Sequence, residues 1–158
     1  MKKKVLVSAC LLGKNCRHDG RHSHLEELDI LDVDWVPVCP EEAGDLGTPR
    51  QAAEMQGSAV SLLTGEGSVV THNGHDVTEK FIMGAEESLK TGINSGAEYA
   101  ILKSRSPSCG LGEIYDGTFT HSLTEGNGIF THLCSLNGIN CISSDDTKKI
   151  KKTLQKQK

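Results

Sequence analysis

The sequence predicts a single α/β domain over residues 1–158, with a mainly parallel sheet, helices on both faces and an inserted β-hairpin. Short apolar runs rich in β-branched residues alternate with amphipathic segments, which is the pattern of parallel strands joined by helices. Three of these runs end at a turn that carries a cysteine. A chain of 158 residues is also long enough to bury one hydrophobic core without disulfides.

The first part of the chain is expected to supply two strands. Residues 4–8 are a continuous apolar run typical of a buried strand, and residues 10–20 follow as a loop with two glycines and two cysteines. A short helix is expected over residues 21–31 and a second strand over residues 33–39. Pro40 then opens a helical turn, because proline is favoured at the first helical position.

A hairpin and a long helix are expected next. Residues 58–64 and 68–71 are assigned to the two strands of the inserted hairpin, because a short loop with two glycines joins them. Asp76 is expected to cap a helix over residues 77–94, and Gly96 to end it.

The last part of the chain returns to the sheet. A third main strand is expected over residues 98–103, followed by mostly loop from 113 to 126. A helix near 127–137, a strand over 139–143 and a lysine-rich helix complete the chain. This order of elements is Rossmann-like, with right-handed crossovers between parallel strands.

Composition and charge argue against several classes of protein. A formal net charge of −4 disfavours a nucleic-acid binder, which usually carries a basic face. No apolar run approaches the roughly 20 residues of a membrane span. No long apolar segment follows the lysines near the N-terminus, so a cytoplasmic protein is expected. In that reducing compartment, cysteines are more often ligands, nucleophiles or core residues than disulfides.

Three cysteines lie just past expected strand ends. Cys10 follows the first strand, Cys39 ends the second, and Cys109 follows the third. Because the carboxyl ends of parallel strands share one edge of a sheet, where open α/β folds bind ligands, these thiols are expected to meet. Cys16, six residues after Cys10, is a candidate fourth member. The other two cysteines occupy apolar positions and are interpreted as core residues.

Thiol ligands suggest a soft metal centre. Three thiolates without a matching histidine favour an iron–sulfur cluster or zinc over hard cations. A [4Fe–4S] cluster on three thiolates leaves one iron without a protein ligand, and that iron can act as a Lewis acid. Zinc would recruit a fourth ligand, for which Cys16 and His18 are the candidates.

Polar residues near the same strand ends are candidates for catalysis and substrate binding. Glu41 and Glu42 follow Cys39 at the expected helix start, where a carboxylate can serve as a general base or simply stabilise the helix. Ser104 is a candidate for orienting a substrate. The remaining candidate substrate contacts are hydroxyls and cations at these turns: Ser8, Arg50, Lys103, Ser106 and Ser108.

The ordered motifs resemble a bacterial family of small domains that includes the thiouracil desulfidases. The resemblance runs over nearly the whole chain, so it is specific for the family. The segments that carry it are Val7-Ser-Ala-Cys-Leu-Leu-Gly13, Cys16-Arg-His-Asp-Gly20, Val38-Cys-Pro-Glu41, Thr48-Pro-Arg50, Ala53-Glu54, Gly74-His-Asp-Val-Thr78, Leu102-Lys-Ser104, Ser106-Pro-Ser-Cys-Gly110, Ile114-Tyr-Asp-Gly-Thr-Phe119 and Gly126-Asn-Gly128.

The resemblance implies a cofactor, a substrate class and a reaction. It implies a [4Fe–4S] cluster on Cys10, Cys39 and Cys109 with one open iron, which would bind the sulfur of a thiolated pyrimidine, thiouracil or its nucleotide. A water activated by Glu41, with Glu42 as second choice, would replace the sulfur without net redox change. His18 and His121 depart from the usual family pattern and bear on the substrate pocket.

Three hypotheses follow from these residues. The first is a cluster-dependent, non-redox desulfidase for a thiolated nucleobase or nucleotide. The second is a zinc or iron–sulfur binding module without catalysis. The third is a hydrolase that uses Cys10 or Cys109 as its nucleophile, activated by a histidine.

Overall fold

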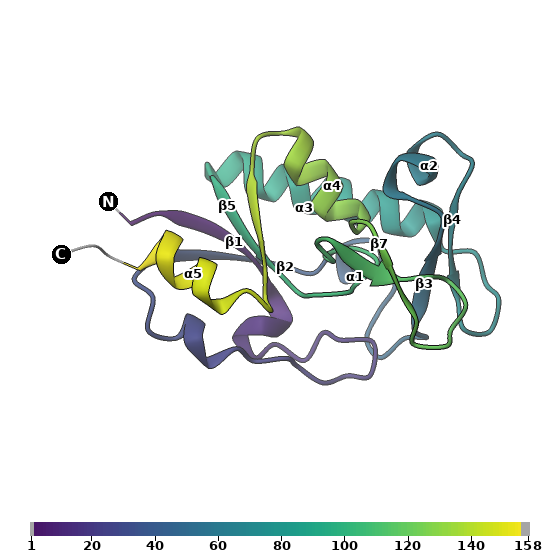
Figure 1. Ribbon diagram of the computed structural model, residues 1–158, viewed down its shortest axis with the longest axis horizontal. Coiled ribbons are helices and arrows are strands. Elements are labelled where there is room, and N and C mark those ends of the chain that lie inside the picture. Colours follow the sequence, from purple (N-terminus) through teal and green to yellow (C-terminus); the bar gives the residue numbers. More distant parts are fainter. Residues whose placement is uncertain (1, 156–158) are drawn as a thin grey trace.

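A four-stranded parallel sheet forms the centre of the computed structural model, which describes residues 2–155 (Figure 1). The strand order is β2-β1-β5-β8. The chain therefore passes from β1 to β2 on one side of it, and later crosses to β5 on the other side. The α/β class and the mainly parallel sheet are as expected from the sequence. The strands are β1 (Lys4–Ser8), β2 (Asp34–Val38), β5 (Tyr99–Leu102) and β8 (Asn140–Ser143).

Helices cover both faces of this sheet. Successive residues of a strand point to opposite faces, and Leu6 accordingly belongs to one buried cluster while Val5 and Val7 belong to the other. The first cluster packs under α3 and α4, and the second under α5 and two short 3₁₀ turns (Figure 1). The bounds are α3 (Thr78–Ser95), α4 (Ile129–Leu136), α5 (Thr147–Leu154), η1 (Ala9–Leu12) and η2 (Glu26–Leu28).

The short helix α1 (Pro40–Ala43) follows β2 and packs closely on α3. Gly84 makes this approach possible, because a Cβ atom there would lie 1.8 Å from the Pro40 carbonyl oxygen. The close packing holds the turn after β2 in place. Among residues 2–155, no helix is both long and apolar enough to cross a membrane.

Two small antiparallel sheets lie together at one end of the molecule (Figure 1). The first joins β3 (Ala53–Gln56) to β4 (Ser68–Thr71), with helix α2 (Ala59–Leu63) between them. The second joins β6 (Glu113–Tyr115) to β7 (Leu123–Glu125). Contacts between β3 and β6 bring the two small sheets together.

The hairpin was expected in the right region but with one wrong strand. Residues 58–64 contain α2 instead of a strand, and the partner of β4 is β3. A capping box explains the helix: Ser58 Oγ accepts from Ser61 N at 3.1 Å, and Ser58 N donates to Ser61 Oγ at 2.8 Å. These serine hydroxyls satisfy helix-end groups that a strand would have paired across a ladder.

Two other expectations were wrong. The helix expected over residues 21–31 is reduced to the turn η2, because the segment bonds to the loop after β1. Ser23 N donates to the Cys10 carbonyl and Leu25 N to the Leu11 carbonyl, each at 2.9 Å. The stretch from 113 to 126, expected as loop, contains β6 and β7. The remaining elements lie within one or two residues of their expected bounds.

Candidate active site

A cavity of about 550 Å³ lies at the carboxyl ends of the central strands. It lies beside β1 and β5, the two adjacent strands between which the strand order reverses. This is the usual ligand position in open α/β folds. Most of the sequence-predicted site residues line it: Ser8, Cys10, Cys16, Cys39, Glu41, Arg50, Lys103, Ser104, Ser106 and Cys109. Two of the predicted residues, Glu42 and Ser108, do not line this cavity.

Strand register brings the three strand-end cysteines to one place. Ser8 pairs with Val38, and the neighbouring residue of β1 pairs with Ile101 of β5, so the three strands end side by side. Cys10 lies in η1 directly after β1, Cys39 precedes α1, and Cys109 lies in the segment between β5 and β6. All three cysteines line the same cavity at the strand ends.

The loop after β1 adds a fourth thiol. Cys16 is only 2% exposed and lies beside Cys10 and Cys39, and the Cys39 thiol lies 3.7 Å from the Cys16 carbonyl oxygen. The neighbouring Cys10 thiol raises the pKa of Cys16 to about 11, and burial acts in the same direction. The neighbouring Cys16 thiol, together with burial, raises the pKa of Cys39 as well.

The buried Cys109 thiol is a poor nucleophile in these surroundings. Burial raises its pKa well above the ordinary thiol value, and the nearby Glu41 carboxylate adds to the shift. A nucleophilic cysteine needs the opposite, a lowered pKa in an electropositive site. A bound metal would reverse the balance, because coordination removes the thiol proton. This environment therefore favours a ligand over a hydrolase nucleophile.

The donor set fits a soft metal centre. The cavity wall carries four thiols, and all cysteines of the chain are free. Thiolates are the ligands that iron–sulfur clusters and zinc prefer. Within residues 2–155, no three His, Cys, Asp or Glu side chains are arranged to hold a single metal ion. The thiols line a space instead of surrounding one point.

Glu41 faces the thiols and is held by a serine. Its Oε2 lies 3.9 Å from Cys39 Sγ, and Ser106 Oγ lies 3.5 Å from its Oε1. The backbone N–H groups of Ser108 and Cys109 both donate to Ser106 Oγ at 3.0 Å. Because these two bonds use the lone pairs of the hydroxyl, its proton is directed to the carboxylate.

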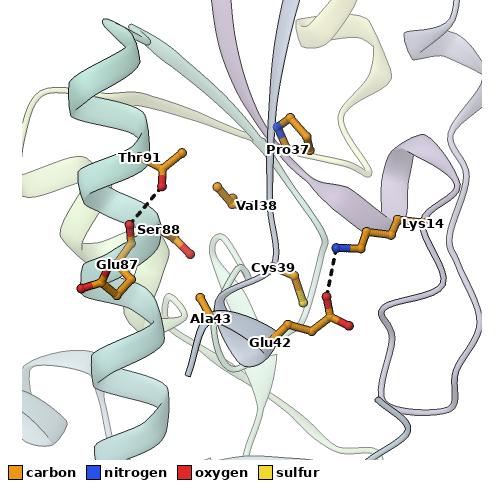
Figure 2. Close-up of a pocket in the computed structure, with 9 residues that line it drawn as sticks. All are labelled: Lys14, Pro37, Val38, Cys39, Glu42, Ala43, Glu87, Ser88 and Thr91. Carbon is orange, nitrogen blue, oxygen red and sulfur yellow. Dashed lines mark hydrogen bonds and ion pairs between the residues drawn. The ribbon is translucent and has the colours of Figure 1, made fainter. Parts of the chain in front are cut away.

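Glu42, the next residue, points away from this cavity. It accepts a hydrogen bond of 2.6 Å from Thr48 Oγ1 and pairs with Lys14 Nζ at 3.1 Å, as Figure 2 shows for the lysine. These two partners lower the pKa of the Glu42 carboxyl, with the threonine as the larger cause. Its surroundings are a second cavity of about 500 Å³ between α1 and α3, which also touches Cys39 (Figure 2).

Serines and cations complete the inner wall. Ser8 Oγ accepts from Lys103 N at 2.9 Å, which ties β1 to β5 at the switch point. Arg50 donates to the Cys16 carbonyl at 2.9 Å, so this guanidinium borders the thiols. Lys103 Nζ lies 3.4 Å from Ser104 Oγ. Ser108, in contrast, does not line the cavity: it is fully buried, and its hydroxyl has no hydrogen-bond partner among the described residues.

Sequence reasoning missed most of the wall that comes from the small sheets. Glu54, His75 and Tyr115 line the cavity together with the strand-end residues, as do His18 and His121, which the resemblance had already singled out. No local pattern marks the first three, since each lies far in sequence from the cysteines it faces. The resemblance offered a signal, because Glu54, His75 and Tyr115 fall inside segments that carry it.

The fold and the site define a class: a small α/β enzyme with a thiol-lined site at the switch point of a parallel sheet. Comparison with known proteins identifies the family. The 2-thiouracil desulfurase family matches residues 5–146, and the chain belongs to it. Membership of this family makes the chain an enzyme of the desulfidase class.

Two similar proteins agree with this assignment. An uncharacterized protein of Bacillus subtilis (strain 168), YbbK, is 38% identical over 149 residues, which cover 92% of this chain and 99% of the relative. A solved structure of a [4Fe–4S]-dependent thiouracil desulfidase, TudS, is 41% identical with a TM-score of 0.83. That match covers 94% of this chain and 95% of the other.

Proposed function

We propose that this enzyme removes sulfur from a thiolated pyrimidine, with a [4Fe–4S] cluster held by Cys10, Cys39 and Cys109. One observation carries the proposal: thiols from three strand ends line one cavity with the Glu41 carboxylate, in a chain 41% identical to a [4Fe–4S]-dependent thiouracil desulfidase. When bound, a cluster on three thiolates supplies an iron with an open position, a Lewis acid suited to a thiocarbonyl sulfur.

Glu41 is the proposed general base. Its carboxylate lies beside Cys39 and is oriented by the Ser106 hydroxyl, so it can take a proton from a water placed between it and the substrate. The water oxygen forms a bond to the ring carbon, and the carbon–sulfur bond breaks. Thiocarbonyl and water become carbonyl and hydrosulfide, so the reaction needs neither oxidant nor reductant. Ser104 lines the cavity and would orient the ring.

The preferred substrate is a nucleotide. The cavity of about 550 Å³ lies within the roughly 300–1,000 Å³ typical of sites for larger small molecules, and it leaves room beyond a pyrimidine base. Basic side chains line the wall, among them Arg50, Lys103 and His75. A guanidinium and an ammonium are the groups that bind a phosphate. We therefore assign Arg50 and Lys103 to the phosphate of a thiolated nucleotide.

Isolation without oxygen tests the proposal. Wild-type protein is expected to contain iron and acid-labile sulfide, and to release sulfide from 4-thiouridine 5′-monophosphate faster than from 4-thiouracil. The Cys39→Ala variant is expected to lose both the iron and the activity. Colourless protein with one zinc per chain and no sulfide release would instead support a binding module. Metal-free activity that alkylation abolishes would support a cysteine hydrolase.

A further inference from the structure

A buried carboxylate outside the thiol cluster connects the two small sheets. Glu54, at the centre of β3, is 9% exposed. Its Oε1 accepts from the backbone N–H groups of Gly117 at 3.0 Å and Phe119 at 3.2 Å. Burial of a carboxylate is costly unless hydrogen bonds replace its hydration, and bonds to a charged acceptor are the strong ones. Glu54 thus holds the turn between β6 and β7.

A second side chain of β3, that of Gln56, hydrogen-bonds to the same turn. Gln56 Nε2 donates to the Gly117 carbonyl at 2.6 Å, so β3 binds both sides of this residue. Gly117 has φ +91, and a Cβ atom there would lie 2.7 Å from the Met55 carbonyl oxygen. Only glycine permits such an approach. We call Glu54, Gln56 and Gly117 the clamp.

The clamped turn carries part of the cavity wall. Phe119 and His121 have φ values of +58 and +61, a conformation that such residues keep only where neighbouring contacts hold them. The Phe119 ring packs edge-on against His72, with centroids 5.2 Å apart. His121 and Tyr115, on the two sides of the turn, both line the cavity, and their rings lie 6.3 Å apart.

We propose that Glu54 is a positioning residue. By holding the turn between β6 and β7, it fixes His121 and Tyr115, which would contact the sugar and phosphate of a nucleotide substrate. The inference rests on the function proposed above. This wall comes from the small sheets, whereas the thiols and Glu41 come from the strand ends. Loss of the clamp should therefore weaken substrate binding and leave the chemical step unchanged. A residue that acts in ground state and transition state alike changes KM, not kcat.

Three variants test this role in protein isolated without oxygen. Glu54→Ala is expected to raise the KM for 4-thiouridine 5′-monophosphate about tenfold with kcat unchanged. It should weaken the binding of uridine 5′-monophosphate, measured by calorimetry, by a similar factor. Glu54→Gln keeps an oxygen acceptor and should stay within about twofold of wild type. Met55→Ala is the matched control, because Met55 is buried beside Glu54 but does not line the cavity.

The control separates positioning from stability. Met55→Ala should lower Tm through lost core packing while KM stays at the wild-type value. The inference is overturned if Glu54→Ala leaves KM unchanged, if it lowers kcat instead, or if Met55→Ala raises KM equally. Should Glu54→Ala fail to fold, Gln56→Ala removes the other arm of the clamp, and an unchanged KM there overturns the inference.

The binding measurement distinguishes this inference from the proposed function. If wild type releases no sulfide, yet binds uridine 5′-monophosphate and loses affinity on Glu54→Ala, the desulfidase proposal fails and the positioning role stands. If wild type releases sulfide and Glu54→Ala matches it in KM and affinity, only the positioning role fails. If wild type neither releases sulfide nor binds the nucleotide, both fail.

Discussion

Two cavities flank helix α1, and they use adjacent carboxylates differently. The larger one contains Glu41 with four thiols, and the smaller one contains Glu42 paired with Lys14 (Figure 2). Both border Cys39. Successive residues of a helix point about 100° apart, so a single step along α1 moves a carboxylate from one cavity to the other. Two glutamates near the same cysteine therefore differ in their roles because they have different hydrogen-bond and ion-pair partners.

The largest expected effect concerns the thiols of the larger cavity. Cys109→Ala should abolish iron binding and sulfide release, because it removes one of three proposed ligands. Cys16→Ala should retain the iron, since Cys16 comes from the loop between η1 and η2 and does not follow a strand of the central sheet directly, as Cys10 and Cys39 do. Iron and acid-labile sulfide per chain after isolation without oxygen provide the measurement. Iron that persists in Cys109→Ala and disappears in Cys16→Ala would reassign the third ligand.

The next effect compares the two carboxylates directly. Glu41→Gln should lower kcat by about 10²–10⁴, the usual contribution of a general base, with iron content unchanged. Glu42→Gln should leave kcat within about twofold of wild type, because its carboxylate is bonded to Lys14 and Thr48 and does not line the larger cavity. Sulfide release from 4-thiouridine 5′-monophosphate under saturation measures both variants. A large loss of kcat in Glu42→Gln, with Glu41→Gln active, would reverse the assignment.

The sequence could predict the strand-end half of this site but not the remainder. Cys10, Cys39 and Cys109 each follow an apolar run that local composition makes a strand, and parallel pairing then brings their ends together. Glu54 lines the cavity and accepts hydrogen bonds from residues 63 and 65 positions away, which no local pattern encodes. The helix α2 has a different, local reason: the reciprocal cap between Ser58 and Ser61 outweighs the hairpin pattern.

The direction in which each acid of α1 points was also beyond sequence reasoning. Glu41 and Glu42 are equivalent as first-turn helix acids. The separation comes from partners outside the helix: Ser106 on the cavity side, and Lys14 and Thr48 on the other. Ser106 and Lys14 lie far from α1 in sequence, so their effect is visible only in the fold, which brings the segment after β5 and the loop after η1 to α1.

The smallest effect concerns stability in the second cavity. The pKa of Glu42 is lowered in the folded protein by Thr48 and Lys14, so its ionised form stabilises the fold at neutral pH. That stabilisation is present above the unfolded-state pKa, given by the ordinary value of 4.5, and is lost as the pH falls through the lowered folded value. Because the Lys14 side chain is 61% exposed, the pair should contribute less than about 1 kcal/mol. Urea unfolding at pH 7 and at the lowest pH at which the protein stays folded should show that the difference between Glu42→Gln and wild type shrinks as the pH falls below 4.5. An equal difference at both pH values would mean that Glu42 stabilises the fold through packing. The contrast between Glu42 in the smaller cavity and Glu41 in the larger one would then not depend on the charge of Glu42.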